Sequence, residues 1–206
     1  MSETVPLDLS VDRVRVFLDG EIVGSLTLSP AKTVAFSYES SWLSSGFSIS
    51  PLSLPLREGV FVAKRDPLHG LFGVFDDSMP DGWGRLLTDR LLRQGGIDPY
   101  SIGTLTRLSI VGSSGMGALE YEPAAVIENS VAATDLDDIA RECANLLETD
   151  FSEDLDQLFA LGGSSGGARP KILTEVDGEE WIIKFPSSID SANIGEQEYR
   201  ISVLAR

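Results

Sequence analysis

A glycine-rich run that leads into a β-hairpin, at residues 161–186, constrains the fold of this chain more than any other stretch (LGGSSGGARPKILTEVDGEEWIIKFP). Within it, Asp177-Gly178 separates two runs that are rich in β-forming residues. Such a pair favours a two-residue hairpin turn, because both central positions of that turn need positive φ. We therefore expect residues 171–175 to pair with residues 181–185.

The glycines ahead of this hairpin are candidates for binding an anion. Four glycines and two serines leave backbone N–H groups free to converge on a phosphate with no Cβ in the way. The alternative is structural: Gly162-Gly163 would end the preceding helix, and Gly166-Gly167 would form a linker. Neither a P-loop nor a GxGxxG pattern follows, so the cluster alone does not specify a nucleotide site.

A lysine, Lys184, interrupts the second apolar run of the hairpin (WIIKFP). A strand lysine in this position could contact the phosphates of a ligand held by the glycines. It could equally extend from an edge strand so that its charged end stays in water.

Charge and composition exclude several classes of function. The 206 residues include 32 acidic and 16 basic side chains, a formal charge of −16, which disfavours direct binding to nucleic acid. One histidine and one cysteine argue against a His/Cys metal site. The first residues do not resemble a signal peptide and no apolar run could span a bilayer, so we expect a cytoplasmic protein without membrane contact.

The first part of the chain is predicted to be mostly β. Residues 14–18 and 22–28 flank Asp19-Gly20, a second hairpin signal. Further short strands are expected at residues 35–38, 52–56 and 60–63, the second of them restricted to a sheet edge by Pro51 and Pro55.

Helices dominate the remainder. Leucines and Trp83 at helical spacing predict a helix that ends at Gly95-Gly96, and a second helix is expected to start with Asp98 as its N-cap. Residues 118–121 are expected to return to strand. Two more helices are predicted after Thr134 and Ser152, the first with Cys143 buried. The last helix, residues 194–206, is expected to turn Tyr199, Val203 and Ile201 inward.

Three runs, in order along the chain, carry a family resemblance: LFGVFDDSMPDGWGRLL, RLSIVGSSGMGALEYEP, and GGSSGGARPK followed by WIIKFPS and EQEYRISVLAR. From residue 14 to residue 206 the chain resembles the HipA family of serine/threonine kinases, the toxins of HipBA toxin–antitoxin systems. The resemblance implies an α+β fold. Residues 1–123 would form a HipA-like N-terminal β-rich subdomain, and residues 124–206 the beginning of a protein-kinase-like core.

The resemblance also assigns roles to residues, with ATP and Mg²⁺ as the cofactors of the full-length protein. Gly166, Gly167 and Ala168 match the flexible phosphate loop. Lys184 matches the strand lysine that contacts the ATP phosphates, and Glu198 matches the helix glutamate that pairs with it. Ser164 corresponds to the serine that family members phosphorylate in themselves.

The partners implied are a HipB-like helix-turn-helix antitoxin, which carries most of the DNA recognition, and a protein substrate such as a translation factor. Family members are longer than this chain, and their catalytic aspartate and metal-binding residues have no match in it. We therefore expect the N-terminal part of a kinase, inactive alone, with some of Phe185, Ile201 and Leu204 exposed. The alternative is a natural non-catalytic binding module of a split system, which would account for residues up to about 123.

Overall fold

The computed structural model describes residues 10–115, 117–124, 136–149, 155–163, 165–176, 178–187, 189–191 and 193–205. The chain forms two compact units. The first consists of residues 1–80 and 97–128, and the second of residues 81–96 and 129–206. Residues 81–96 thus belong to the unit built mainly from later residues, whereas the division expected from the sequence lies after residue 123.

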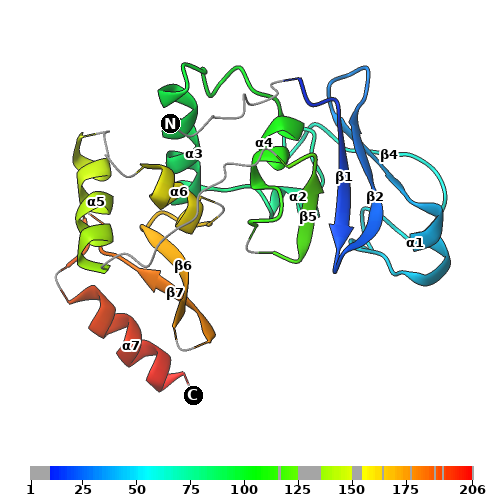
Figure 1. Ribbon diagram of the computed structural model, residues 1–206. Coiled ribbons are helices and arrows are strands. Elements are labelled where there is room, and N and C mark those ends of the chain that lie inside the picture. The colour runs from blue at the N-terminus through cyan, green and yellow to red at the C-terminus, as the bar shows by residue number, and fades with distance from the viewer. Residues whose placement is uncertain are drawn as a thin grey trace. The chain divides into compact units, whose positions relative to one another are not determined.

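The first unit contains a five-stranded antiparallel sheet and three short helices (Figure 1). The strands are β1 (Arg13–Leu18), β2 (Glu21–Leu28), β3 (Val34–Tyr38), β4 (Phe61–Val62) and β5 (Leu119–Glu122), in the order β4-β3-β2-β1-β5. The helices are α1 (Ser40–Ser45), α2 (Gly73–Asp76) and α4 (Thr104–Val111).

The predicted turn between the first two strands is confirmed. Asp19 and Gly20 both have positive φ, 51° and 77°, and Leu18 pairs directly with Glu21. The short polar side chain of Asp19 tolerates this conformation, and glycine adopts it without a steric penalty. Successive side chains of a strand point to opposite faces of the sheet, so Val14 and Val16 share one face, and both are fully buried.

One hydrophobic core fills the space between the sheet and helices α2 and α4, which lie on the same side of β1 in Figure 1. At its centre the ring of Phe36 lies 4.8 Å from that of Tyr38 and 5.3 Å from that of Phe75, measured between centroids. Tyr121 of β5 is also buried, and its hydroxyl donates to Ser78 Oγ at 2.6 Å. Burial raises the pKa of this tyrosine to about 12.

The predicted strand at 52–56 is wrong. Leu52 is fully exposed, and an isolated bridge between Ser50 and Leu54 closes a tight turn instead. The prolines on either side, 51 and 55, lack the N–H groups that a ladder needs. The buried hydroxyl of Tyr38 donates to the carbonyl oxygen of Leu54 at 2.6 Å and anchors this turn in the core.

The helix predicted from Asp98 begins later than expected. Asp98 Oδ1 accepts the N–H of Tyr100 at 3.0 Å, so the residue stabilises a turn of its own. Helix α4 starts only at Thr104, after Gly103. Aspartate followed by proline favours both arrangements, and the local pattern does not distinguish a helix start from a turn.

In its described residues, the second unit combines four helices with a two-stranded hairpin. The helices are α3 (Gly82–Gln94), α5 (Leu136–Thr149), α6 (Leu155–Gly162) and α7 (Ile194–Leu204), and the strands are β6 (Lys171–Val176) and β7 (Glu179–Lys184). The hairpin confirms the predicted pairing, with Lys171 opposite Lys184 and Val176 opposite Glu179. The turn residue Asp177 and the expected caps Thr134 and Ser152 lie outside the described residues.

Helix α3 packs on α6, and α6 packs on β6. Trp83, Leu158 and Ile172, one from each of these elements, are almost completely buried. Cys143 of α5 is buried as predicted, and burial raises the pKa of its thiol to about 12. Within the described segments, none of the helices has both the length and the apolar composition that crossing a membrane requires.

The predicted orientation of the last helix is wrong. Helix α7 has no buried residue, and Tyr199, Ile201 and Val203 are 68%, 66% and 49% exposed. Of the apolar residues expected to be exposed, Ile201 and Leu204 are, whereas Phe185 is buried. The N–H of Phe185 donates to the carbonyl oxygen of Pro170 at 2.8 Å, which extends the hairpin and turns this ring inward.

We predict that Leu54→Ala lowers the free energy of unfolding by about 2–5 kcal/mol, because it removes a fully buried side chain and leaves a cavity. The matched control is Leu52→Ala, two residues earlier and fully exposed, with an expected effect within about 0.5 kcal/mol. Urea unfolding followed by circular dichroism measures both. Equal effects of the two substitutions would contradict the turn described above.

Candidate functional site

The glycine-rich segment begins as a continuation of helix α6. The N–H of Gly163 donates to the carbonyl oxygen of Phe159 at 2.7 Å, and the N–H of Ser165 donates to that of Gly162 at 3.0 Å. The hydroxyl of Ser165, which is fully buried, donates to the same Gly162 oxygen at 2.6 Å. The first pair of glycines therefore ends a helix, as the structural alternative expected, and the second pair lies in the loop beyond it. That this loop binds an anion stays a prediction.

Gly166, Gly167 and Ala168, the expected phosphate loop, are exposed. Gly167 has a φ of +84°, which favours glycine at this position. Its N–H donates to the carboxylate of Asp81, and Lys171 Nζ donates to the carbonyl oxygen of Gly166. Ser164, the expected site of autophosphorylation, lies outside the described residues.

Lys184 and Glu198 form the ion pair that the sequence led us to expect. Lys184 Nζ, at the end of β7, lies 3.4 Å from Glu198 Oε2 on α7. Both side chains are about half exposed, so the pair is open to solvent and to a ligand. That these two residues bind a nucleotide stays a prediction.

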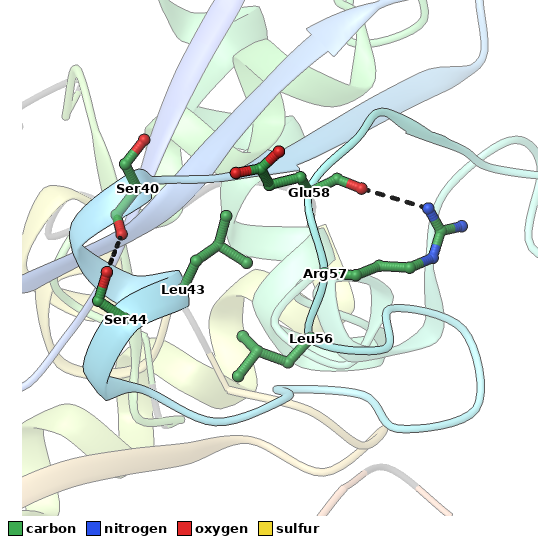
Figure 2. A pocket seen from close by; sticks show the side chains of 6 residues that line it. All are labelled: Ser40, Leu43, Ser44, Leu56, Arg57 and Glu58. Atoms are coloured by element: carbon green, nitrogen blue, oxygen red, sulfur yellow. Dashed lines mark hydrogen bonds between the residues drawn. The ribbon is translucent and has the colours of Figure 1, made fainter.

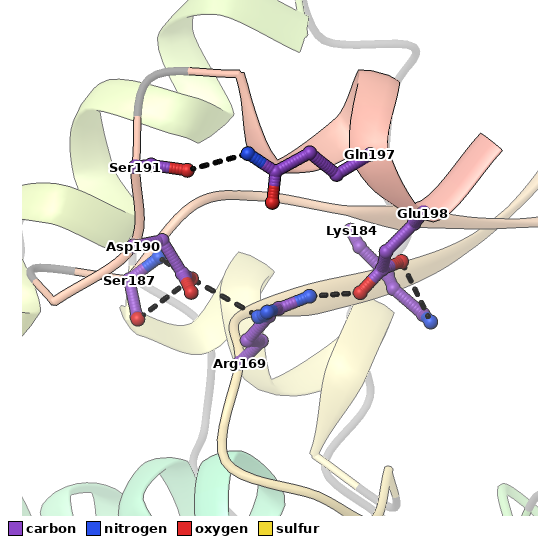
Figure 3. Close-up of polar contacts among 7 residues, drawn as sticks. All are labelled: Arg169, Lys184, Ser187, Asp190, Ser191, Gln197 and Glu198. Carbon is purple, nitrogen blue, oxygen red and sulfur yellow. Dashed lines mark hydrogen bonds and ion pairs between the residues drawn. The ribbon is translucent and has the colours of Figure 1, made fainter. Parts of the chain in front are cut away.

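Arg169, which sequence reasoning missed, holds the same glutamate from the other side (Figure 3). Its Nη1 contacts Glu198 Oε1, and its Nε lies 3.0 Å from Asp190 Oδ2. Asp190 in turn accepts the N–H and the hydroxyl of Ser187, at 2.8 and 2.7 Å. Arg169 thus connects the end of the glycine loop to α7 and to the turn at 187–190.

A sequence signal for Arg169 was present but not specific. The residue follows the glycine loop directly and precedes the first hairpin strand (GGARPK). An arginine there could extend into water or fold back on the hairpin, and only its partners decide which. Asp190 and Asp81 carry no specific signal either, because an aspartate in a turn does not indicate which partner it will find.

The pKa values of both carboxylates in this cluster are lowered by their partners. The pKa of Glu198 is lowered chiefly by its hydrogen bond from Lys184, with Arg169 adding to the effect. The pKa of Asp190 is lowered chiefly by the N–H and hydroxyl of Ser187. A lowered pKa means that each group stabilises the fold above its ordinary pKa, and that this contribution is lost as the pH falls through the lowered value.

Lys171 and Lys184 face each other across the hairpin. They are direct partners in the ladder, so their side chains lie on the same face of the two strands. Like charges in this position repel. An anion between the two ammonium groups would relieve that repulsion, and Lys171 Nζ also donates to the carbonyl oxygen of Gly166 in the exposed loop.

The acidic residues do not suggest a metal centre. Within the described segments, no three His, Cys, Asp or Glu side chains come close enough to share an ion. The cluster around Glu198 instead pairs each carboxylate with a cation or a hydroxyl.

A separate pocket in the first unit has a volume of about 390 Å³ and is lined by Ser40, Leu43, Ser44, Leu56, Arg57 and Glu58. Figure 2 shows the guanidinium of Arg57 directed away from Leu43 and toward the backbone of Glu58, whose carbonyl oxygen accepts from it at 3.3 Å. The same guanidinium lies 4.6 Å from the ring centroid of Phe61. These contacts give Arg57 a structural role.

Comparison with known proteins points to one family. A family model described as the HipA N-terminal domain matches residues 14–122, more than half of the chain. Among solved structures, a HipA chain from a Shewanella oneidensis MR-1 complex of HipA, HipB and operator DNA is similar, with 18% sequence identity and a TM-score of 0.43. That match covers 84% of this chain and 38% of the other. Among curated proteins no match was found.

We predict that Lys184→Met raises the pKa of Glu198, because it removes the largest cause of the lowering. NMR titration of the Glu198 side-chain carboxyl carbon measures this directly. Lys64→Met, which removes an exposed lysine of the other unit, is the control and should change nothing. An unaltered Glu198 pKa in the first variant would show that the ion pair is not formed.

Proposed function

Because the chain belongs to the HipA family, whose N-terminal domain it matches over residues 14–122, we propose that it provides the phosphate-binding part of a HipA-type, ATP-dependent serine/threonine protein kinase toxin. The observation that carries this proposal is the ion pair between Lys184 and Glu198 beside the glycine loop. A strand lysine paired with a glutamate of the following helix is what kinase chemistry uses to hold ATP phosphates.

In this proposal, some residues of the site would neutralise phosphate charge and others would hold those residues in position. Lys184 would neutralise phosphate charge, while Glu198 fixes its ammonium group and is itself held by Arg169. The N–H groups of Gly166 and Ala168, which have no hydrogen-bond partner among the described residues, would bind phosphate oxygens. ATP, when bound, supplies the phosphoryl group to be transferred.

The chain alone is proposed to bind nucleotide without transferring phosphate. The catalytic aspartate and the Mg²⁺ ligands that the resemblance implies have no counterpart among its matched runs, and the described residues contain no acidic cluster for the metal. We therefore assign no step to Mg²⁺ here. A non-catalytic module of a split system remains the second candidate for the first unit, but it leaves the Lys184–Glu198 pair without a role.

The partners of this kinase toxin are proposed from the family alone. They are a HipB-like helix-turn-helix antitoxin and, as substrate, a cytoplasmic protein such as a translation factor. Contact with DNA would run mainly through the antitoxin, in keeping with the charge of −16 on this chain.

We predict that titration of the ¹⁵N-labelled chain with ATP shifts the amide signals of Gly166, Gly167 and Ala168, with an affinity near or weaker than about 1 mM because half a site is present. Lys184→Ala should weaken binding about tenfold, the equivalent of about 1.4 kcal/mol. Lys64→Ala, at an exposed position of the first unit, is the matched control and should bind like the wild type. Loop amides that do not respond to ATP would refute the proposed function.

A second prediction concerns Ser164, proposed as the site of autophosphorylation. A phosphate there adds about two negative charges next to the loop that receives the ATP phosphates, so it should weaken ATP binding. Ser164→Glu is expected to lower the affinity and Ser164→Ala to preserve it, in the same titration. Ser45→Glu, on α1 of the other unit, controls for added charge. Equal affinities of the two Ser164 variants would contradict this regulation.

A further inference from the structure

Asp81 stands at the N-cap of helix α3 but does not cap it. An aspartate in this position ordinarily accepts an N–H from the first turn of its own helix. Here the side chain makes no such bond, and its Oδ1 accepts the N–H of Gly167 instead. The two residues are 86 positions apart in the sequence and belong to the same compact unit.

The start of α3 also donates to the same glycine. The N–H of Trp83 donates to the carbonyl oxygen of Gly167 at 2.8 Å. Gly82, between them, has a φ of +43°, and a Cβ placed on it would overlap that carbonyl and lie 2.9 Å from the Cα of Ala168. The Asp81–Trp83 segment and the loop therefore meet backbone to backbone, and both polar groups of the Gly167 backbone are engaged.

This contact fixes Gly167, in the middle of the loop, and leaves the N–H groups of the residues on either side of it available to a ligand. The N–H groups of Gly166 and Ala168 have no partner among the described residues, while Lys171 Nζ donates to the carbonyl oxygen of Gly166. A loop of consecutive glycines has many accessible conformations, and ordering it on binding costs free energy. A loop already held at Gly167 avoids part of that cost.

We propose that Asp81 is a positioning residue that holds the glycine loop in the conformation in which the amides of Gly166 and Ala168 bind phosphate. This inference rests on the proposed nucleotide-binding function. Asp81 acts through the hydrogen bond to Gly167 and not through its charge, since a carboxylate repels a phosphate. An asparagine, which keeps the acceptor oxygen and loses the charge, should therefore replace it, and an alanine should not.

The test measures loop order and ligand affinity separately in the 206-residue chain. Amide hydrogen exchange at Gly167 needs no nucleotide, and we expect it to be at least tenfold faster in Asp81→Ala and near wild type in Asp81→Asn. In ATP titrations we expect Asp81→Ala to bind three- to tenfold more weakly, and Asp81→Asn to bind at least as tightly as wild type. Asp98→Ala, which removes a carboxylate bonded to a backbone N–H in the other unit, should change neither quantity.

A second variant disturbs the same contact at the backbone of residue 82 and leaves the carboxylate unchanged. Gly82→Ala keeps the Asp81 carboxylate but places a methyl group against the Gly167 carbonyl, so it should speed exchange at Gly167 and weaken ATP binding. Unchanged exchange at Gly167 in both Asp81→Ala and Gly82→Ala overturns the proposal. So does tighter ATP binding by Asp81→Ala, which would mean that the carboxylate blocks the loop.

The two proposals fail in distinguishable ways. If the wild-type loop does not respond to ATP, the proposed function fails and the nucleotide role of Asp81 fails with it, whatever the exchange rates. If the wild type binds ATP and Lys184→Ala weakens binding while Asp81→Ala does not, the proposed function stands and the role of Asp81 is refuted.

Discussion

The carboxylate of Glu198 holds two cations at once, and the polar architecture of the second unit depends on it. One oxygen contacts Arg169, at the end of the glycine loop, and the other lies 3.4 Å from Lys184 on the neighbouring strand. Three consecutive segments, the loop, the hairpin and helix α7, are thereby fixed to a single side chain. Helix α7 buries no residue of its own, and these two ion pairs connect it to the loop and the hairpin.

The two units are stabilised in different ways. The first has a dense core under its sheet, with Phe36, Tyr38 and Phe75 in ring contact. The second leaves apolar side chains of its hairpin and last helix in water, among them Trp181, Ile201 and Leu204. The second unit also has a buried core, which includes Trp83, Leu158 and Ile172, and the ion pairs around Glu198 lie outside it, where they respond to salt and pH.

Sequence reasoning was most successful where the backbone itself was restricted. Asp19-Gly20 specified a turn because few residues accept positive φ twice in succession, and the register of β1 with β2 followed. It failed at residues 52–56 and at Asp98, where proline and aspartate permit several local structures. It also failed for α7, since an apolar stripe indicates which face a helix can bury but not whether anything covers that face.

The sequence by itself determined the α+β class, the two hairpins, the burial of Cys143 and the pairing of Lys184 with Glu198, the last through family resemblance. Each of these depends on local backbone preference or on a motif of fixed order. Only the tertiary structure decided that Arg169 shares Glu198 and that Asp81 holds Gly167. Those contacts join residues 29 and 86 positions apart, and side-chain type does not specify a partner at such separations because any exposed carboxylate would serve equally well.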